Sequence, residues 1–129
     1  MPHITVEYTA NLGAEADITG LLRTINDVLI AQGGLFPTGG IRSRAIELAH
    51  YRIADGAADD AFVHVTAKIG AGRDETAKKR AFDALFAALE QHFAPLLARR
   101  YLALSMEVAE FSEAGTWKHN NIHARFGKR

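Results

Sequence analysis

The sequence predicts an α/β (α+β) fold, in which two β-α-β units form a four-stranded mixed sheet with two helices on one face. Three observations lead to it: a strand-like alternation starts almost at the N-terminus, a helical apolar stripe and a second alternating segment follow, and this order then repeats. The chain's 129 residues suffice for one compact domain and are too few for two of ordinary size. We expect the units at residues 2–54 and 61–111, with a C-terminal tail at residues 112–129.

The first unit opens with a strand at residues 3–9, where Ile4, Val6 and Tyr8 share one face. A turn at residues 11–14 precedes a helix that starts near Glu15. Its apolar positions recur with helical spacing and comprise Ile18, Leu21, Leu22, Ile25, Val28 and Leu29. Two glycines then end the helix, and residues 41–53 alternate loosely, which predicts a long second strand.

The second unit repeats this plan with a strand at residues 61–69 and a glycine-rich turn. Asp74 is the expected cap of a helix, and Pro95 should kink or end its last turns. The buried stripe of that helix comprises Phe82, Leu85, Phe86, Leu89 and Phe93. Residues 101–111 alternate again, and the polar tail that follows holds the only tryptophan, Trp117.

One face of the predicted sheet lacks cover within the chain, because right-handed crossovers place both helices on the same side. The open face should carry Val63, Val65 and Ile69, or the residues that alternate with them. Since a half-covered parallel sheet is rare, we expect other subunits to cover this face.

Composition narrows the function. The chain has no cysteine, which excludes disulfides and thiolate catalysis, and its 15 basic and 15 acidic residues argue against a nucleic-acid partner. The N-terminus lacks the features of a signal peptide, and no segment has the length of a membrane span, so we expect no membrane partner and a cytoplasmic location. His119 and His123 have a metal-ligand spacing without an acidic ligand nearby, and we expect no metal site.

Pro2 is the candidate catalytic base. Removal of Met1 would expose a secondary amine, whose pKa burial and nearby cations would lower. A base with a pKa near the working pH moves protons in both directions, as a tautomerisation requires. By itself, however, a proline in second position also fits the simple role of permitting methionine removal.

Two arginines are candidate carboxylate ligands. Arg73 follows a Gly-Ala-Gly turn and precedes a helix N-terminus, where anions bind favourably, although it also fits a solvated residue paired with Asp74 or Glu75. Arg42 and Arg44 share one face of a strand, so that one can reach a site while the other serves an interface. Either also fits a simple surface cation.

The Met-Pro start and several segments together resemble the 5-carboxymethyl-2-hydroxymuconate isomerase family of the tautomerase superfamily. These segments are Gly40-Ile41-Arg42-Ser43-Arg44, Lys68-Ile69-Gly70-Ala71-Gly72-Arg73, Ala61-Phe62-Val63-His64 and Asn120-Asn121-Ile122-His123. The resemblance implies a homotrimer with sheets facing inward, a small-molecule polycarboxylate substrate and no cofactor. It also implies Pro2 as base, with Arg42 and Arg73 as substrate-binding residues, and a role in homoprotocatechuate (4-hydroxyphenylacetate) degradation.

Two other functions remain open at this point. A different proline-dependent tautomerase activity would keep Pro2 and change the substrate, whereas a trimeric interaction protein would make the proline incidental. The sequence assigns no role to His3, Arg44, Asn120 or Asn121. Phe36 and Trp117 fit either apolar walls of a site or ordinary packing.

Overall fold

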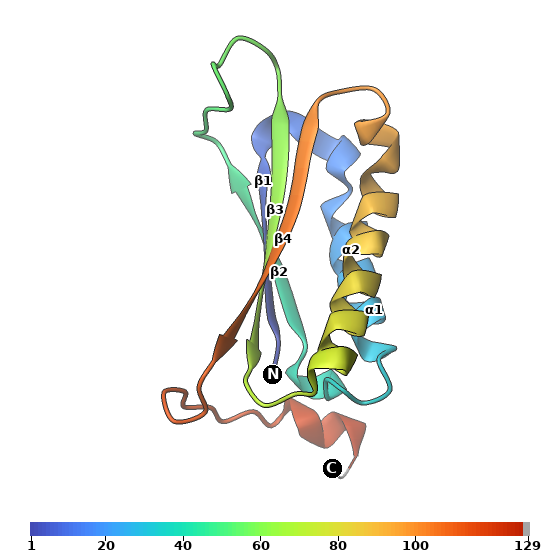
Figure 1. Ribbon diagram of the computed structural model, residues 1–129, viewed down its shortest axis with the longest axis vertical. Helices are drawn as coiled ribbons and strands as arrows, with labels where there is room; N and C mark the ends of the chain where they lie inside the picture. The colour runs from blue at the N-terminus through green and yellow to red at the C-terminus, as the bar shows by residue number, and fades with distance from the viewer. Residues whose placement is uncertain (128–129) are drawn as a thin grey trace.

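The computed structural model describes residues 1–127 and consists of one sheet with two long helices against one of its faces (Figure 1). The strand order is β2-β1-β3-β4. The strands are β1 (His3–Thr9), β2 (Arg42–Leu48), β3 (Ala61–Gly70) and β4 (Leu102–Phe111), and the long helices are α1 (Ile18–Ile30) and α2 (Glu75–Leu97).

The pairing confirms the predicted mixed sheet of two β-α-β units. β1 runs parallel to β2, and β3 runs parallel to β4, as expected for strands joined by a crossover helix. β1 and β3 pair antiparallel at the centre, where His3 lies opposite Lys68 and Tyr8 opposite Val63. Strand ends from both units therefore meet at one edge of the molecule, close to the N-terminus.

The core lies between the sheet and the helices. On β3 the residues that face the helices are fully buried: Val63, Val65, Ala67 and Ile69. Val63, Val65 and Ile69 were one of the two sets expected on the open face, and their burial leaves that face to the residues that alternate with them. The alternating residues Phe62, His64, Thr66 and Lys68 face away from the helices. Successive side chains of a strand point to opposite faces of the sheet. Shifting the assignment by one residue therefore moves every residue of the strand to the other face.

Both helices bury the predicted stripes. On α1 the innermost residues are Leu21, Ile25 and Leu29, and on α2 they include Phe82, Leu85, Leu89 and Phe93. Asp17 and Asp74 cap the two helices by accepting backbone N–H groups of Gly20 and Ala77. α2 ends two residues beyond Pro95.

Two segment predictions need correction. Residues 41–53 form a strand only over Arg42–Leu48, because β1 ends at Thr9, the register partner of Leu48, and the chain beyond has no strand to pair with. Residues 11–14, expected as a turn, belong to the 3-10 helix Ala10–Ala16, and α1 starts at Ile18 rather than near Glu15.

The tail folds back across the end of the sheet. After β4 it crosses beneath the N-terminus and ends in a short 3-10 helix, Ile122–Phe126, which lies beside another one, Thr38–Gly40 (Figure 1). Within residues 1–127, no helix is both long and apolar enough to cross a membrane.

Candidate active site

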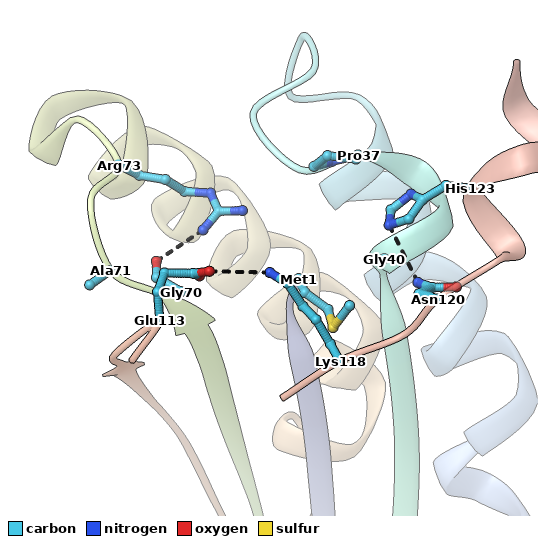
Figure 2. A pocket seen from close by; sticks show the side chains of 10 residues that line it. All are labelled: Met1, Pro37, Gly40, Gly70, Ala71, Arg73, Glu113, Lys118, Asn120 and His123. Carbon is cyan, nitrogen blue, oxygen red and sulfur yellow. Dashed lines mark hydrogen bonds and ion pairs between the residues drawn. The ribbon is translucent and has the colours of Figure 1, made fainter. Parts of the chain in front are cut away.

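A cavity of about 340 Å³ opens at the edge of the sheet where the chain begins. Three segments far apart in sequence surround Met1 there: the loop before β2, the turn after β3 and the tail (Figure 2). The loop contributes Pro37 and Gly40, and the turn contributes Gly70, Ala71 and Arg73. The tail contributes Glu113, Lys118, Asn120 and His123.

The amino group of Met1 lies in an environment that disfavours its charged form. Burial, followed by the charges of Arg73, Lys118 and Arg42, lowers the pKa of this amine from 8.0 to about 6, while Glu113 acts in the opposite direction. An amine with such a pKa is largely unprotonated at neutral pH. The cavity therefore holds the N-terminus of the chain in a state that accepts protons.

Pro2 is buried immediately behind Met1, at the entry to β1. Its carbonyl oxygen accepts the backbone N–H of Arg42 at 3.2 Å, which fixes the start of the chain to the start of β2. Gly40 lies beside Met1, and a Cβ there would lie 3.5 Å from the Met1 Cα. The predicted base Pro2 does not itself line the cavity, whereas Met1, the residue before it, does.

Arg73 lines the cavity, and protein contacts hold it in place. Its Nε donates to the carbonyl oxygen of Leu35 at 3.1 Å, and its Nη1 donates to that of Gly70 at 3.0 Å. Its guanidinium carbon lies 4.7 Å from the centroid of the Phe36 ring, which is buried. Burial lowers the pKa of Arg73, against the opposing charges of Glu110 and Glu113. Phe36 therefore supports Arg73 rather than forming a wall of the cavity.

Arg42, the other predicted ligand, does not line the cavity of this protomer. It lies on the open face of the sheet, where its Nη2 is 3.1 Å from His3 Nε2. Arg44 approaches the other ring nitrogen of His3 at 3.3 Å. Burial, then Arg42 and Arg44, lowers the pKa of His3. A neutral imidazole accepts at one nitrogen only, so one of these two arginines lacks a matching acceptor on His3.

The tail supplies two lining residues that sequence reasoning missed, Lys118 and Glu113. Lys118 Nζ lies 3.4 Å from Glu113 Oε1, and the Asn120 side chain donates to the carbonyl oxygen of Gly39 at 2.9 Å. His123 packs against Gly39. The sequence offered no signal for Lys118 or Glu113, because single charges in a polar tail have no periodicity. Trp117, for which a wall and ordinary packing were both open, is 89% exposed and does not line the cavity of this protomer.

Across the described part of the chain, no group of three or more His, Cys, Asp or Glu side chains is placed to hold a metal ion. His119 is exposed, and His123 faces the cavity beside Asn120. What the cavity does contain is an amine whose pKa burial and the charges of Arg73, Lys118 and Arg42 lower.

Comparisons with known proteins show the family of the chain. The family model described as 5-carboxymethyl-2-hydroxymuconate isomerase matches residues 2–126. A 5-carboxymethyl-2-hydroxymuconate Delta-isomerase of Escherichia coli is 44% identical over 98% of this chain and 99% of its own length.

Solved structures extend the likeness to the fold. A 5-carboxymethyl-2-hydroxymuconate isomerase from Deinococcus radiodurans superposes with a TM-score of 0.94 at 55% identity, covering 98% of this chain and 95% of the other. A fused 4-OT symmetric trimer, at 18% identity, has a TM-score of 0.66 over 91% of this chain and 93% of its own, which supports the fold alone. The chain belongs to the 5-carboxymethyl-2-hydroxymuconate isomerase family.

Proposed function

We propose that this protein is a cofactor-independent isomerase that ketonises 5-carboxymethyl-2-hydroxymuconate, with the imino nitrogen of Pro2 as general base once Met1 has been removed. The observation that carries the proposal is the environment of the N-terminus. An amino group there is partly buried, lies near three cations and has its pKa lowered to about 6. The substrate is inferred from the isomerases of this name to which the chain is related.

The reaction moves one proton. The Pro2 nitrogen takes the proton of the 2-hydroxyl group while the oxygen forms a carbonyl. The dienol electrons shift along the chain, and the same nitrogen returns the proton to a carbon, as a 1,3- or 1,5-shift. No atom is gained or lost, so no oxidant, reductant or cofactor is needed. A pKa near the working pH lets the amine accept the proton and release it within one turnover.

The cations hold the anionic substrate. Arg73 has N–H groups beyond the two that contact Leu35 and Gly70, and these can bind a carboxylate in bidentate form. Arg42 is the second carboxylate ligand in this proposal. Its support is that its charge already acts on the N-terminal amine and that its buried Nε has no hydrogen-bond partner within residues 1–127. It would act from the open sheet face.

We further propose that the chain is a single domain and assembles as a homotrimer with its sheets inward, acting on a small-molecule polycarboxylate in homoprotocatechuate (4-hydroxyphenylacetate) degradation. Support comes from the open sheet face of the protomer and from the symmetric trimer that shares its fold. Neighbouring subunits would then supply the cover that the chain lacks.

The decisive experiment starts with the intact mass, which shows whether Met1 is absent. The processed protein is then assayed on 5-carboxymethyl-2-hydroxymuconate and on other 2-hydroxydienoates. Pro2→Ala should lower kcat by ~10²–10⁴-fold, the usual loss of a general base. Full activity with Met1 retained would exclude the mechanism, because an amide nitrogen is not basic. Preference for another dienoate would indicate a different tautomerase, and no turnover would favour an interaction protein.

A further inference from the structure

We propose that Lys118 binds one carboxylate of the substrate and so selects a dienol with three carboxylates over one that lacks the carboxymethyl arm. The inference rests on the proposed function and assigns a specificity residue to it. Its basis is the set of charges that line the cavity. Among the described lining residues, Arg73 and Lys118 are the two basic side chains other than His123, and Glu113 is the acidic one.

Arg73 is already partly occupied. Two of its N–H groups serve the backbone carbonyls of Leu35 and Gly70, and Phe36 covers one face of the guanidinium. The remaining N–H groups of the guanidinium suit one carboxylate bound in bidentate form. Arg42 lies outside the lining, against His3. A trianionic substrate therefore meets one further permanent cation in this protomer's cavity, which is Lys118.

Lys118 is available for a ligand. Its Nζ lies 3.4 Å from Glu113 Oε1, and the two side chains are 44% and 66% exposed, so the pair is long and solvated and contributes little. In contrast, Lys78 Nζ lies 2.6 Å from the carboxylates of both Glu75 and Glu110. In Figure 2 the Lys118 side chain extends past Met1 towards Glu113, on the side of the cavity that Arg73 enters. A substrate carboxylate can replace Glu113 as its partner.

The tail keeps Lys118 at the cavity. Two residues further on, Asn120 donates to the Gly39 carbonyl oxygen and accepts the backbone N–H of Ile122 at 2.8 Å. His123 then packs on Gly39, which leaves no room for a side chain there. The backbone that carries Lys118 is thus anchored to the loop before β2. A flexible lysine on an anchored backbone suits a point-charge contact to the arm of a substrate.

The test compares two substrates. Lys118→Met removes the charge and keeps the length of the side chain, and Lys79→Met is the control, since Lys79 is 77% exposed and pairs with Asp83 on the outside of α2. We expect Lys118→Met to lower kcat/KM for 5-carboxymethyl-2-hydroxymuconate by roughly 10-fold or more, mainly through KM, as for loss of a hydrogen bond to a charged group. The dicarboxylate 2-hydroxymuconate should lose less than about 3-fold, and Lys79→Met should match the wild type on both.

Glu113→Gln provides an independent measurement. It removes the competing anion, and we expect KM for the tricarboxylate to fall while KM for the dicarboxylate stays nearly constant. Equal losses on both substrates in Lys118→Met, or no loss on either, would overturn the inference while leaving an active isomerase. A processed wild-type protein that turns over neither substrate would overturn the proposed function as well.

Discussion

The side-chain amide of Asn120 donates from Nδ2 to the carbonyl oxygen of Gly39 at 2.9 Å, across 81 residues of sequence. The contact joins the C-terminal tail to the loop that precedes β2. At the same place, a Cβ on Gly39 would lie 2.8 Å from the His123 Cα and 2.9 Å from its backbone nitrogen. The cavity wall formed by the tail thus requires that residue 39 have no side chain.

Gly39→Ala should displace the tail, because two of the three atoms that a Cβ would approach to less than 3.0 Å are backbone atoms of His123, which cannot turn aside as a side chain can. In the wild-type structure the Ile122 amide donates to the side-chain oxygen of Asn120. In the variant we expect this amide to exchange hydrogen faster, together with a lower kcat/KM. A displacement of about 1 Å can cost up to ~10²-fold in rate. We expect the sheet and the two long helices to retain their stability, since the contact that is lost joins the tail to the loop before β2.

Gly40→Ala is the matched control. A Cβ at that neighbouring position meets its nearest atoms, in His123 and Met1, at 3.5 Å, which is ordinary van der Waals contact. Its tail amides should exchange as in the wild type. If Gly39→Ala also leaves the exchange of Ile122 unchanged, the tail is not held where the structure places it.

Arg73 combines a structural and a binding role, and its replacement should reveal both. Arg73→Met removes the donors to Leu35 and Gly70 and the contact with the Phe36 ring. We expect a loss of ~1–3 kcal/mol in the free energy of unfolding by urea, in addition to a lower kcat/KM. Arg73→Lys should restore little, because an ammonium group cannot reproduce the fork.

Arg80→Met tests whether this loss is specific. Arg80 is exposed on α2, and its replacement should change the free energy of unfolding by less than about 0.5 kcal/mol. Wild-type stability and kinetics in Arg73→Lys would show that charge alone suffices at residue 73.

The sequence predicted the fold well wherever hydrophobic periodicity decides the structure. The stripes of both helices and the crossover strands followed from spacing, since residues such as Leu21 on α1 and Leu85 on α2 face the same core. Periodicity could not settle which set of β3 residues faces outward, because both sets contain apolar residues such as Phe62 and Val63.

The candidate site was only partly predictable for a different reason. Pro2 follows the first residue of the chain, and Arg73 follows a glycine turn before a helix. Both are places where the sequence itself indicates a candidate base or an anion ligand. The tail contributes Lys118 and Glu113 through long-range anchoring at Gly39, a contact made by a backbone and a side-chain amide. Such a contact needs no apolar pattern, so no periodicity reveals it. Residues 128–129 of the predicted tail lie outside the described residues.

The pKa of the N-terminal amine can be measured directly on protein that retains Met1, produced with methionine aminopeptidase inhibited. Competitive labelling with acetic anhydride should show an amine that titrates near 6 in the folded protein and near 8.0 in the unfolded chain. Lys118→Met should raise the pKa, because it removes a cation, and Glu113→Gln should lower it.

The same pKa shift fixes the direction in which stability changes with pH. Between about pH 6 and 8 the unfolded chain binds more protons at this amine than the folded protein does, so the contribution of this group to stability rises with pH over that range. Below the folded pKa both states are protonated, and the contribution is constant. A labelling midpoint near 8.0 in the folded protein would show that the cavity does not perturb the amine.

The open face of the sheet leads to the last prediction, which concerns assembly. Thr66 lies in the middle of that face on central strand β3, between its register partners Thr5 and Glu107. If neighbouring subunits cover this face, light scattering of the wild type at micromolar concentration should give the mass of a trimer. Thr66→Glu would place a second carboxylate beside Glu107 at the interface, where burial of like charges is unfavourable. We expect it to dissociate the trimer. In the separate protomer the new side chain would face water, so the protomer should keep its circular dichroism spectrum.

Thr76→Glu makes the same substitution on the exposed surface of α2 and should leave the mass unchanged. A monomeric wild type, or a Thr66→Glu variant that remains trimeric, would show that this face is not the subunit interface.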